Sequence, residues 1–212
     1  VLAAVYADFV QGAAYASALA GFASNANQMT RQMTVQGIGT RVARSQVGAP
    51  QWFGQLEGGY RFGLDTVSRA SVTPFARLEA STVWQGAFTE WGADGLNLAV
   101  ASQSTTTLRS VLGAEFAASY RLGMQAPLDL QLRLGWAHDY ADMSRPVTAA
   151  FAAAPGAAFT IQGAAPPRDS LMVGLGASTL IDERYTLFFR YDGDIAAGAT
   201  NHALTAGIRF RW

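Results

Sequence analysis

The sequence predicts an all-β fold, namely an antiparallel β-barrel whose strands cross a membrane. Three observations support this prediction: apolar side chains alternate with polar ones along many segments, turn signals separate these segments, and aromatic residues gather near the segment ends. Alternation with a period of two is typical of a strand with one apolar and one polar face. A transmembrane barrel needs such strands because its outer face contacts lipid and its inner face lines a lumen.

Turn signals divide the chain into about nine strand-like segments. Several exceed the roughly 9–11 residues that a tilted strand needs to cross a bilayer, so we expect their ends to project into solvent. In chain order, the segments lie at 1–10, 13–31, 38–63, 70–91, 97–121, 127–142, 167–182, 185–195 and 201–212.

The first two segments require a choice between strands and a helix. Val1 to Ala23 is apolar enough to suggest a transmembrane helix. Asp8 lies within this stretch, however, and Gln11-Gly12 is a typical turn, so we expect two strands. The chain begins without Met or a basic leader, carries no recognisable signal peptide, and is expected to be an excerpt of a longer precursor.

The later segments show the alternation most clearly. From Leu128 to Tyr140 and again from His202 to Trp212, the large apolar side chains occupy even positions. Phe188 is an exception, since it lies on the polar side of its segment. Because charged residues keep to one side of each segment, we expect a lumen-facing set made of Glu57, Arg61, Arg77, Glu79, Arg109, Glu115, Asp129, Arg133, Arg190, Asp192, Arg209 and Arg211.

The expected lumen face combines both signs of charge. All fifteen cationic residues of the chain are arginine, whose guanidinium pairs well with carboxylates, although genomic base composition explains the same usage equally well. Rings of such charges could select ions. Because positive and negative side chains are mixed, we favour a polar network that stiffens the barrel and keeps a passage open.

Aromatic residues concentrate near the segment ends, which is typical of the two interfacial girdles of a membrane barrel. A soluble core could also use these aromatics, so their placement gains weight only together with the alternation. The residues expected at the interfaces are Tyr60, Trp84, Tyr120, Trp136 and Tyr140.

The connections fall into two groups. Compact connections, which include Gln11-Gly12, Gly63 to Arg69, Leu122 to Ala126 and Asp182 to Arg184, all lie on the side of Trp212, the periplasmic side of an outer-membrane barrel. The opposite group contains the long segment from Met143 to Arg168. Apolar residues there flank Pro155-Gly156, and we expect a projecting hairpin.

Composition and motifs argue against several classes of function. The formal net charge is zero and only 14% of residues are charged, so the chain lacks the basic surface of a nucleic-acid-binding protein. It has no cysteine and two histidines, His138 and His202. His138 and Asp139 point to opposite faces of a strand and cannot form a dyad. Without any catalytic or metal-binding motif, we expect no enzyme, cofactor, bound metal or small-molecule substrate.

Three stretches carry a resemblance to a known family. These are Gln55-Leu-Glu-Gly-Gly-Tyr-Arg-Phe62, Leu132-Arg-Leu-Gly-Trp-Ala-His-Asp-Tyr140, and the run from Phe151 to Ser170. Together they resemble the C-terminal β-domain of autotransporters, the translocator barrels of type V secretion. The similarity extends from about Ala4 to Trp212, so we expect one domain over residues 1–212.

The resemblance implies a monomeric twelve-stranded barrel in the bacterial outer membrane. Such a barrel anchors an N-terminal passenger on the same polypeptide and enables its export to the cell surface. Its assembly depends on the barrel-assembly machinery, which recognises a signal in the last strand. By this resemblance, the signal residues here are Leu204, Ile208, Phe210 and Trp212. Because bacterial barrels of one chain have an even number of strands, the nine segments here imply that about three N-terminal strands are missing.

Two other hypotheses remain open on sequence grounds. A porin-like or structural outer-membrane barrel predicts only a few strands upstream and measurable ion conductance. A soluble β-sandwich or lipocalin-like binder predicts solubility without detergent, with the apolar face buried against a second layer.

Overall fold

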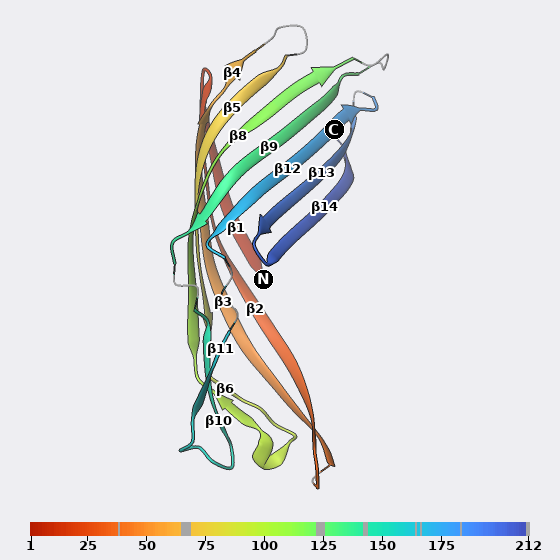
Figure 1. The fold of residues 1–212 in the computed structure, drawn as a ribbon. Coiled ribbons are helices and arrows are strands. Elements are labelled where there is room, and N and C mark those ends of the chain that lie inside the picture. The colour runs from red at the N-terminus through yellow and green to blue at the C-terminus, as the bar shows by residue number, and fades with distance from the viewer. Residues whose placement is uncertain are drawn as a thin grey trace.

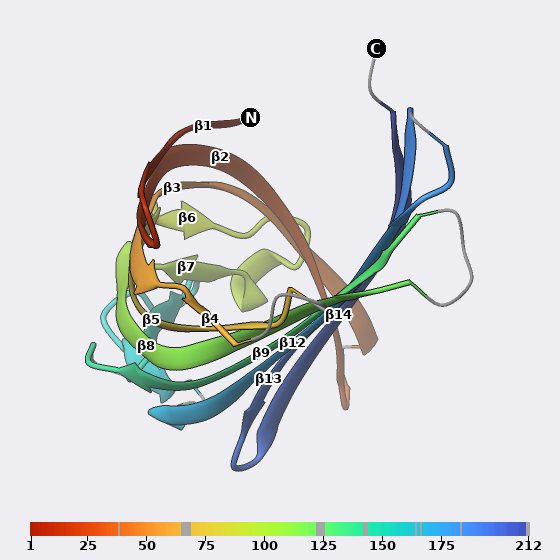
Figure 2. The same ribbon diagram turned by 90° about the horizontal axis from the view of Figure 1, so that it is seen from above.

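The computed structural model describes the chain except for residues 38, 65–68, 122–125, 142, 143, 164, 166, 183, 211 and 212. The described residues form two antiparallel sheets, and the larger one is strongly curled (Figures 1 and 2). The predicted all-β, antiparallel architecture is confirmed.

The larger sheet keeps nine strands in chain order, and a tenth short strand, β4 (Phe62–Gly63), pairs only with β5. The strand order runs through β1 (Leu2–Gln11), β2 (Ala14–Val35), β3 (Gly39–Tyr60), β5 (Ser71–Gln85), β8 (Gln103–Tyr120), β9 (Leu128–Asp139), β12 (Asp169–Leu180), β13 (Tyr185–Ala196) and β14 (Ala199–Phe210). Each neighbouring pair keeps one unbroken register. Every side chain therefore keeps its face across the whole sheet.

The outer face of this sheet is apolar and uncovered. Leu112 lies opposite Trp136, Trp136 opposite Leu171, and Leu171 opposite Ile195. The first three side chains are exposed by 53%, 50% and 49%, although a water-soluble sheet would bury such a row. A contiguous apolar surface of this kind requires an apolar surrounding.

The inner face holds a small core. Phe75, Val111 and Ala137 are buried together, and Tyr15 and Met172 pack against them. Tyr15 lies on β2 and Met172 on β12, which are separated by four strands in the sheet. The curl brings these distant strands close enough for contact across the concave side.

Glycines on β8 and β9 make room for the Phe75 ring. Gly113 and Gly135 lie opposite each other, and a Cβ added at Gly113 would overlap both the carbonyl oxygen of Leu134 and the Phe75 ring. We therefore expect Gly113→Ala to lower the free energy of unfolding by about 1–3 kcal/mol through overpacking. Unfolding of the refolded chain by increasing concentrations of guanidinium chloride measures this loss.

Gly48→Ala is the matched control for that prediction, because a Cβ at Gly48 meets nothing within 4 Å and its backbone is ordinary for a strand. It should leave the unfolding midpoint nearly unchanged. Equal loss from both variants would show that glycine content of the strands, rather than the space under Phe75, sets the cost.

The second sheet has the strand order β11 (Phe159–Gln162), β10 (Pro146–Phe151), β7 (Leu98–Val100) and β6 (Phe88–Thr89). A 3-10 helix, η1 (Asp94–Leu96), joins β6 to β7. This sheet lies beside the tip of the long β2–β3 hairpin, at the end of the molecule that we call the hairpin end (Figure 1). The opposite end, with the turn at Gly12, is the turn end.

Two predicted segments are wrong because each spans strands of both sheets. The stretch 70–91 divides into β5 and β6, and 97–121 divides into β7 and β8, so each stretch contributes to both sheets. Alternation alone could not reveal this division, since a strand alternates in whichever sheet it joins. The predicted hairpin between Met143 and Arg168 is confirmed by the pairing of β10 with β11, whereas Met143 itself lies outside the described residues.

The first two predicted strands are confirmed as the β1–β2 hairpin, with Gly12 at a φ of 62° in its turn. Among the described residues, no helix has the length and apolar character needed to cross a bilayer.

Candidate functional site

The predicted lumen residues gather on the concave face. By register, all of those in the described strands share one face of the larger sheet, the face of the buried core. They are Glu57, Arg77, Glu79, Arg109, Glu115, Asp129, Arg133, Arg190, Asp192 and Arg209. Arg61 lies between β3 and β4 with an exposed side chain, and Arg211 lies outside the described residues. Whether this face lines a lumen stays a prediction.

Glu57 is the centre of the ionic contacts on this face. Its side chain is 8% exposed, and its carboxylate accepts a hydrogen bond of 2.8 Å from the Tyr15 hydroxyl and contacts the Arg133 guanidinium. Arg77 Nη1 lies 3.9 Å from the same carboxylate, and Arg77 Nε lies 2.9 Å from Glu79 without good hydrogen-bond alignment. Glu57 thus ties β2, β3, β5 and β9 together across the curl.

Further pairs connect the later strands. Arg109 on β8 contacts Asp194 on β13 (2.5 Å) and donates to the Ser170 hydroxyl. The Arg133 guanidinium lies 3.7 Å from the centre of the Phe75 ring, a cation–π arrangement. Such contacts skip intervening strands, so they help to hold the curvature of the sheet.

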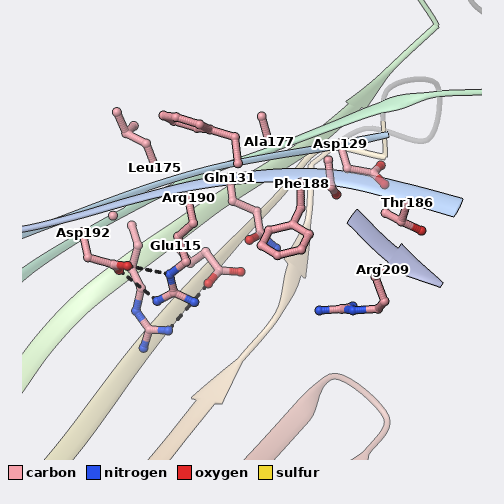
Figure 3. A pocket seen from close by; sticks show the side chains of 15 residues that line it. Glu115, Asp129, Gln131, Leu175, Ala177, Thr186, Phe188, Arg190, Asp192 and Arg209 are labelled. Carbon is pink, nitrogen blue, oxygen red and sulfur yellow. Dashed lines mark hydrogen bonds and ion pairs between the residues drawn. The ribbon is translucent and has the colours of Figure 1, made fainter. Parts of the chain in front are cut away.

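A recess of about 230 Å³ lies on this face between β9, β12 and β13. In Figure 3, Arg190, Asp192 and Glu115 lie on one side of the strands, and Leu175 and Ala177 point to the other. Arg190 holds Asp192 through two hydrogen bonds, of 2.7 and 2.9 Å. Both signs of charge are present along the recess, whereas a filter that selects ions by charge would present one sign.

Phe188, the exception to the alternation, has a structural explanation. It lies opposite Gly207, whose missing side chain leaves room for the ring. The Arg209 guanidinium lies 5.7 Å from the ring centre, so the Phe188 ring makes a cation–π contact on the charged face.

Sequence reasoning missed two residues of the network, Tyr15 and Asp194. Asp194 has the same position in the alternation as Asp192 and could have been found from that signal. Tyr15 is surrounded by small residues and carries no charge, so only the structure reveals its bond to Glu57.

A second ionic contact joins the two sheets at the hairpin end. Arg31 on β2 donates to Glu90, with 3.0 Å between Nε and Oε1, and also to the Leu96 carbonyl (2.9 Å). The Leu98 N–H donates to the same carboxylate. Beside this contact, the backbones of Arg44 and Trp91 exchange two hydrogen bonds, and Ala43 and Ala93 are buried. The long hairpin is therefore docked onto the second sheet.

The surroundings of Glu90 favour the charged form of its carboxylate. Burial would raise its pKa, but the bonds from Arg31 and from the Leu98 N–H outweigh burial and leave the pKa below its ordinary value of 4.5. The same contact raises the pKa of Arg31. A lowered folded-state pKa means that the contact stabilises docking above pH 4.5 and that this stabilisation is lost as the pH falls through the lowered value.

We expect Glu90→Gln to weaken docking of the β2–β3 hairpin by about 1–3 kcal/mol, since the nearly buried Glu90 position loses the charge that binds both Arg31 and the Leu98 N–H. Hydrogen exchange of residues 24–50 measures this loss. At acid pH, hydrogen exchange of the hairpin in the wild type should rise toward the rate in the variant. The rate in the variant should not rise further. Asp94→Asn is the matched control, because Asp94 is 89% exposed and lies 3.9 Å from Arg41; an equal effect there would contradict the assignment to Glu90.

The predicted interfacial aromatic residues lie toward the ends of the strands, and all have exposed side chains. Tyr60 and Tyr120 end β3 and β8 at the turn end, whereas Trp84, Trp136 and Tyr140 lie toward the hairpin end. Their interfacial role stays a prediction.

His138 and Asp139 point to opposite faces, as predicted. His138 instead pairs with Asp169 across the strands, with 2.8 Å between Nδ1 and Oδ1, and the Trp136 indole donates to the same oxygen. In the part of the chain that the structure describes, no group of three or more metal-binding side chains is found.

The predicted assembly-signal residues Leu204, Ile208 and Phe210 lie on the outer face of the edge strand β14, with exposed side chains. Trp212 lies outside the described residues. Recognition by an assembly machinery stays a prediction.

Comparison with known families gives one match. Residues 1–192 match the family described as Autotransporter beta-domain, which covers β1 through most of β13 and leaves β14 outside. No curated protein matches the chain.

Proposed function

The chain belongs to the autotransporter β-domain family, and from this premise we propose that it anchors an N-terminal passenger in the bacterial outer membrane and enables its export to the cell surface. The family is one of translocator domains of outer-membrane secretion. Passenger export by this chain, its residence in the outer membrane and its monomeric state belong to the proposal.

One observation carries the proposal furthest, namely the opposite character of the two faces of one curled sheet. The outer face exposes leucine and tryptophan side chains that need lipid, and the inner face holds paired charges that need water or a polar guest. The second sheet lies at the hairpin end and does not cover the apolar face (Figure 1). A soluble β-sandwich would cover it.

The structures found at the turn end and at the hairpin end support one orientation of the chain in the membrane. The turn end holds the tight turn at Gly12 and the last described residue of β14, while the hairpin end holds the second sheet and the β2–β3 hairpin. Outer-membrane barrels have short periplasmic turns and longer extracellular loops, so we assign the hairpin end to the cell exterior. The barrel-assembly machinery is the proposed partner at the other end, through the outer face of β14.

Surface accessibility tests the proposal. The full reading frame that contains this chain is expressed with an epitope tag far upstream, and intact cells are probed with antibody and protease alongside membrane fractionation. We expect a surface-exposed, protease-sensitive tag and an outer-membrane C-terminal part. A C-terminal part in the outer membrane without a surface tag would favour a porin-like or structural barrel, and recovery in the soluble fraction would contradict both.

A further inference from the structure

The second sheet is built as a unit of its own. Its four strands pair with one another, β10 with β11 and β7, and β6 with β7. Two links of two residues each join it to the larger sheet, Gly86-Ala87 between β5 and β6 and Ala101-Ser102 between β7 and β8. The other two connections include residues outside the described part of the chain. Hinges consist of a few residues at the ends of elements, often small ones, so these links allow the second sheet to turn as one body.

The second sheet meets the β2–β3 hairpin through one short segment, residues 90–98, which we call the docking segment. The contact consists of an ion pair, one isolated bridge between Arg44 and Trp91, and the buried side chains of Ala43 and Ala93. Side chains as small as alanine bury little apolar area, so they stabilise a contact only weakly. The strands of the larger sheet are joined by long, unbroken ladders instead. We therefore expect docking to break before any pairing in the larger sheet.

The docking segment lies on the concave side of the hairpin. Arg31 has the same position in the alternation of β2 as Tyr15, and Ala43 has the same position on β3 as Glu57. Glu90 of the docking segment contacts Arg31 on that face. In Figure 2, β6, β7 and the short helix between them lie within the outline of the larger sheet. The docking segment therefore stands in front of the hairpin end of the charged concave face.

Docking depends on a glycine at the point of closest approach. Gly92 has a φ of 97°, and a Cβ added there would lie 2.8 Å from the carbonyl oxygen of Val42 on β3. A side chain at this position would strain the backbone of the docking segment and push it away from the hairpin. One substitution can thus weaken docking without a change of charge.

We propose that the second sheet is a gate at the hairpin end of the concave face. Docked on the β2–β3 hairpin, it obstructs the passage along this face, and turned about the links at Gly86-Ala87 and Ala101-Ser102, it opens the passage to a passenger. The inference rests on the proposed function, because it takes the concave face as the wall of a passage through the membrane. Each sheet keeps its internal ladders in both states, so only the docking contact has to break and form.

A disulfide that locks the docked state tests the gate. The chain has no cysteine of its own. The backbones of Arg44 and Trp91 exchange hydrogen bonds of 2.8 and 2.9 Å, as in an antiparallel pair whose Cα atoms lie about 5.5 Å apart, a spacing that a disulfide spans. The full-length protein with Arg44→Cys and Trp91→Cys is purified from outer membranes and recorded in planar lipid bilayers. Its disulfide form should open about tenfold less often than its reduced form.

The matched control is the pair Thr34→Cys and Thr40→Cys. These threonines lie opposite each other near the tip of the same hairpin, with 3.1 Å between their Oγ1 atoms. Their disulfide stays within the hairpin and should leave the frequency of opening unchanged. Equal suppression by both disulfides would trace the effect to the hairpin alone and overturn the gate. Equal opening of the locked and reduced forms would overturn it as well.

Gly92→Ala tests the gate in the opposite direction. Its weakened docking should raise the frequency of opening about tenfold. Gly37→Ala is its control, because Gly37 has a φ of 85° but a Cβ there meets nothing within 4 Å. The control shares the backbone strain and lacks the clash, so Gly92→Ala opening no more often than Gly37→Ala would contradict the proposal. Heat-modifiability on gels checks that each variant is folded.

Passenger display on intact cells, measured with the same variants, separates the two proposals. A displayed passenger together with a conductance that responds neither to the lock nor to Gly92→Ala overturns the gate alone. A chain that does not fractionate with the outer membrane overturns the proposed function, and the gate fails with it.

Discussion

Glu57→Leu is expected to lower the free energy of unfolding by about 3 kcal/mol, the lower end of the cost of removing one partner from a buried ion pair. The loss leaves two guanidiniums, those of Arg77 and Arg133, without their shared carboxylate, and it leaves the Tyr15 hydroxyl without its acceptor. The cost stays at the lower end because Glu79 and Glu115 remain near these arginines. Unfolding of the vesicle-embedded chain by guanidinium chloride, followed by circular dichroism, measures this loss of free energy.

The matched control is Asp192→Asn on the same face. The Arg190–Asp192 pair is largely exposed, with side chains at 64% and 46%, so its loss should cost at most about 1 kcal/mol. Similar losses from the two variants would mean that the concave face is fully hydrated and that Glu57 has no special role in the curl.

Leu134→Arg is expected to cost about 2–4 kcal/mol of folding free energy in a bilayer, the penalty for a cation on the lipid face near the midplane. Leu134 lies in the middle of β9 on the outer face and is 37% exposed. The same variant should reduce the assembled fraction in cells. Folding into vesicles of defined lipid composition measures the free energy, and heat-modifiability of outer-membrane fractions measures the assembled fraction.

Gln131→Arg on the same strand is the control, since Gln131 faces the concave side and is exposed there. It should fold and assemble almost as well as the wild type. If Gln131→Arg were the more damaging change, the assignment of the two faces would be reversed.

Much of the larger sheet could be predicted from the sequence because one physical signal recurs along it. Period-two alternation assigns Leu130 outward and Arg133 inward without any knowledge of the partner strand. The unbroken registers then carry this assignment across the sheet. Residues such as Glu115 and Arg190 are assigned to the same face for this reason alone.

The rest depends on tertiary contacts that no local pattern encodes. The division of 70–91 between two sheets follows from where β6 finds its partner in β7, which is a long-range choice. The docking of Arg31 on Glu90 joins residues 59 positions apart. The central role of Glu57 likewise depends on the curl, which brings β9 over β3.

The arginine-only composition of the concave network makes its contacts directional as well as ionic. A guanidinium is planar and presents its N–H donors in a fixed fork, so it can bind one carboxylate through two bonds or stack on an aromatic ring. Arg190 binds Asp192 in the first way, and Arg133 stacks on Phe75 in the second. An ammonium group at either position would keep the charge and lose this geometry, so lysine would not be an equivalent residue on this face.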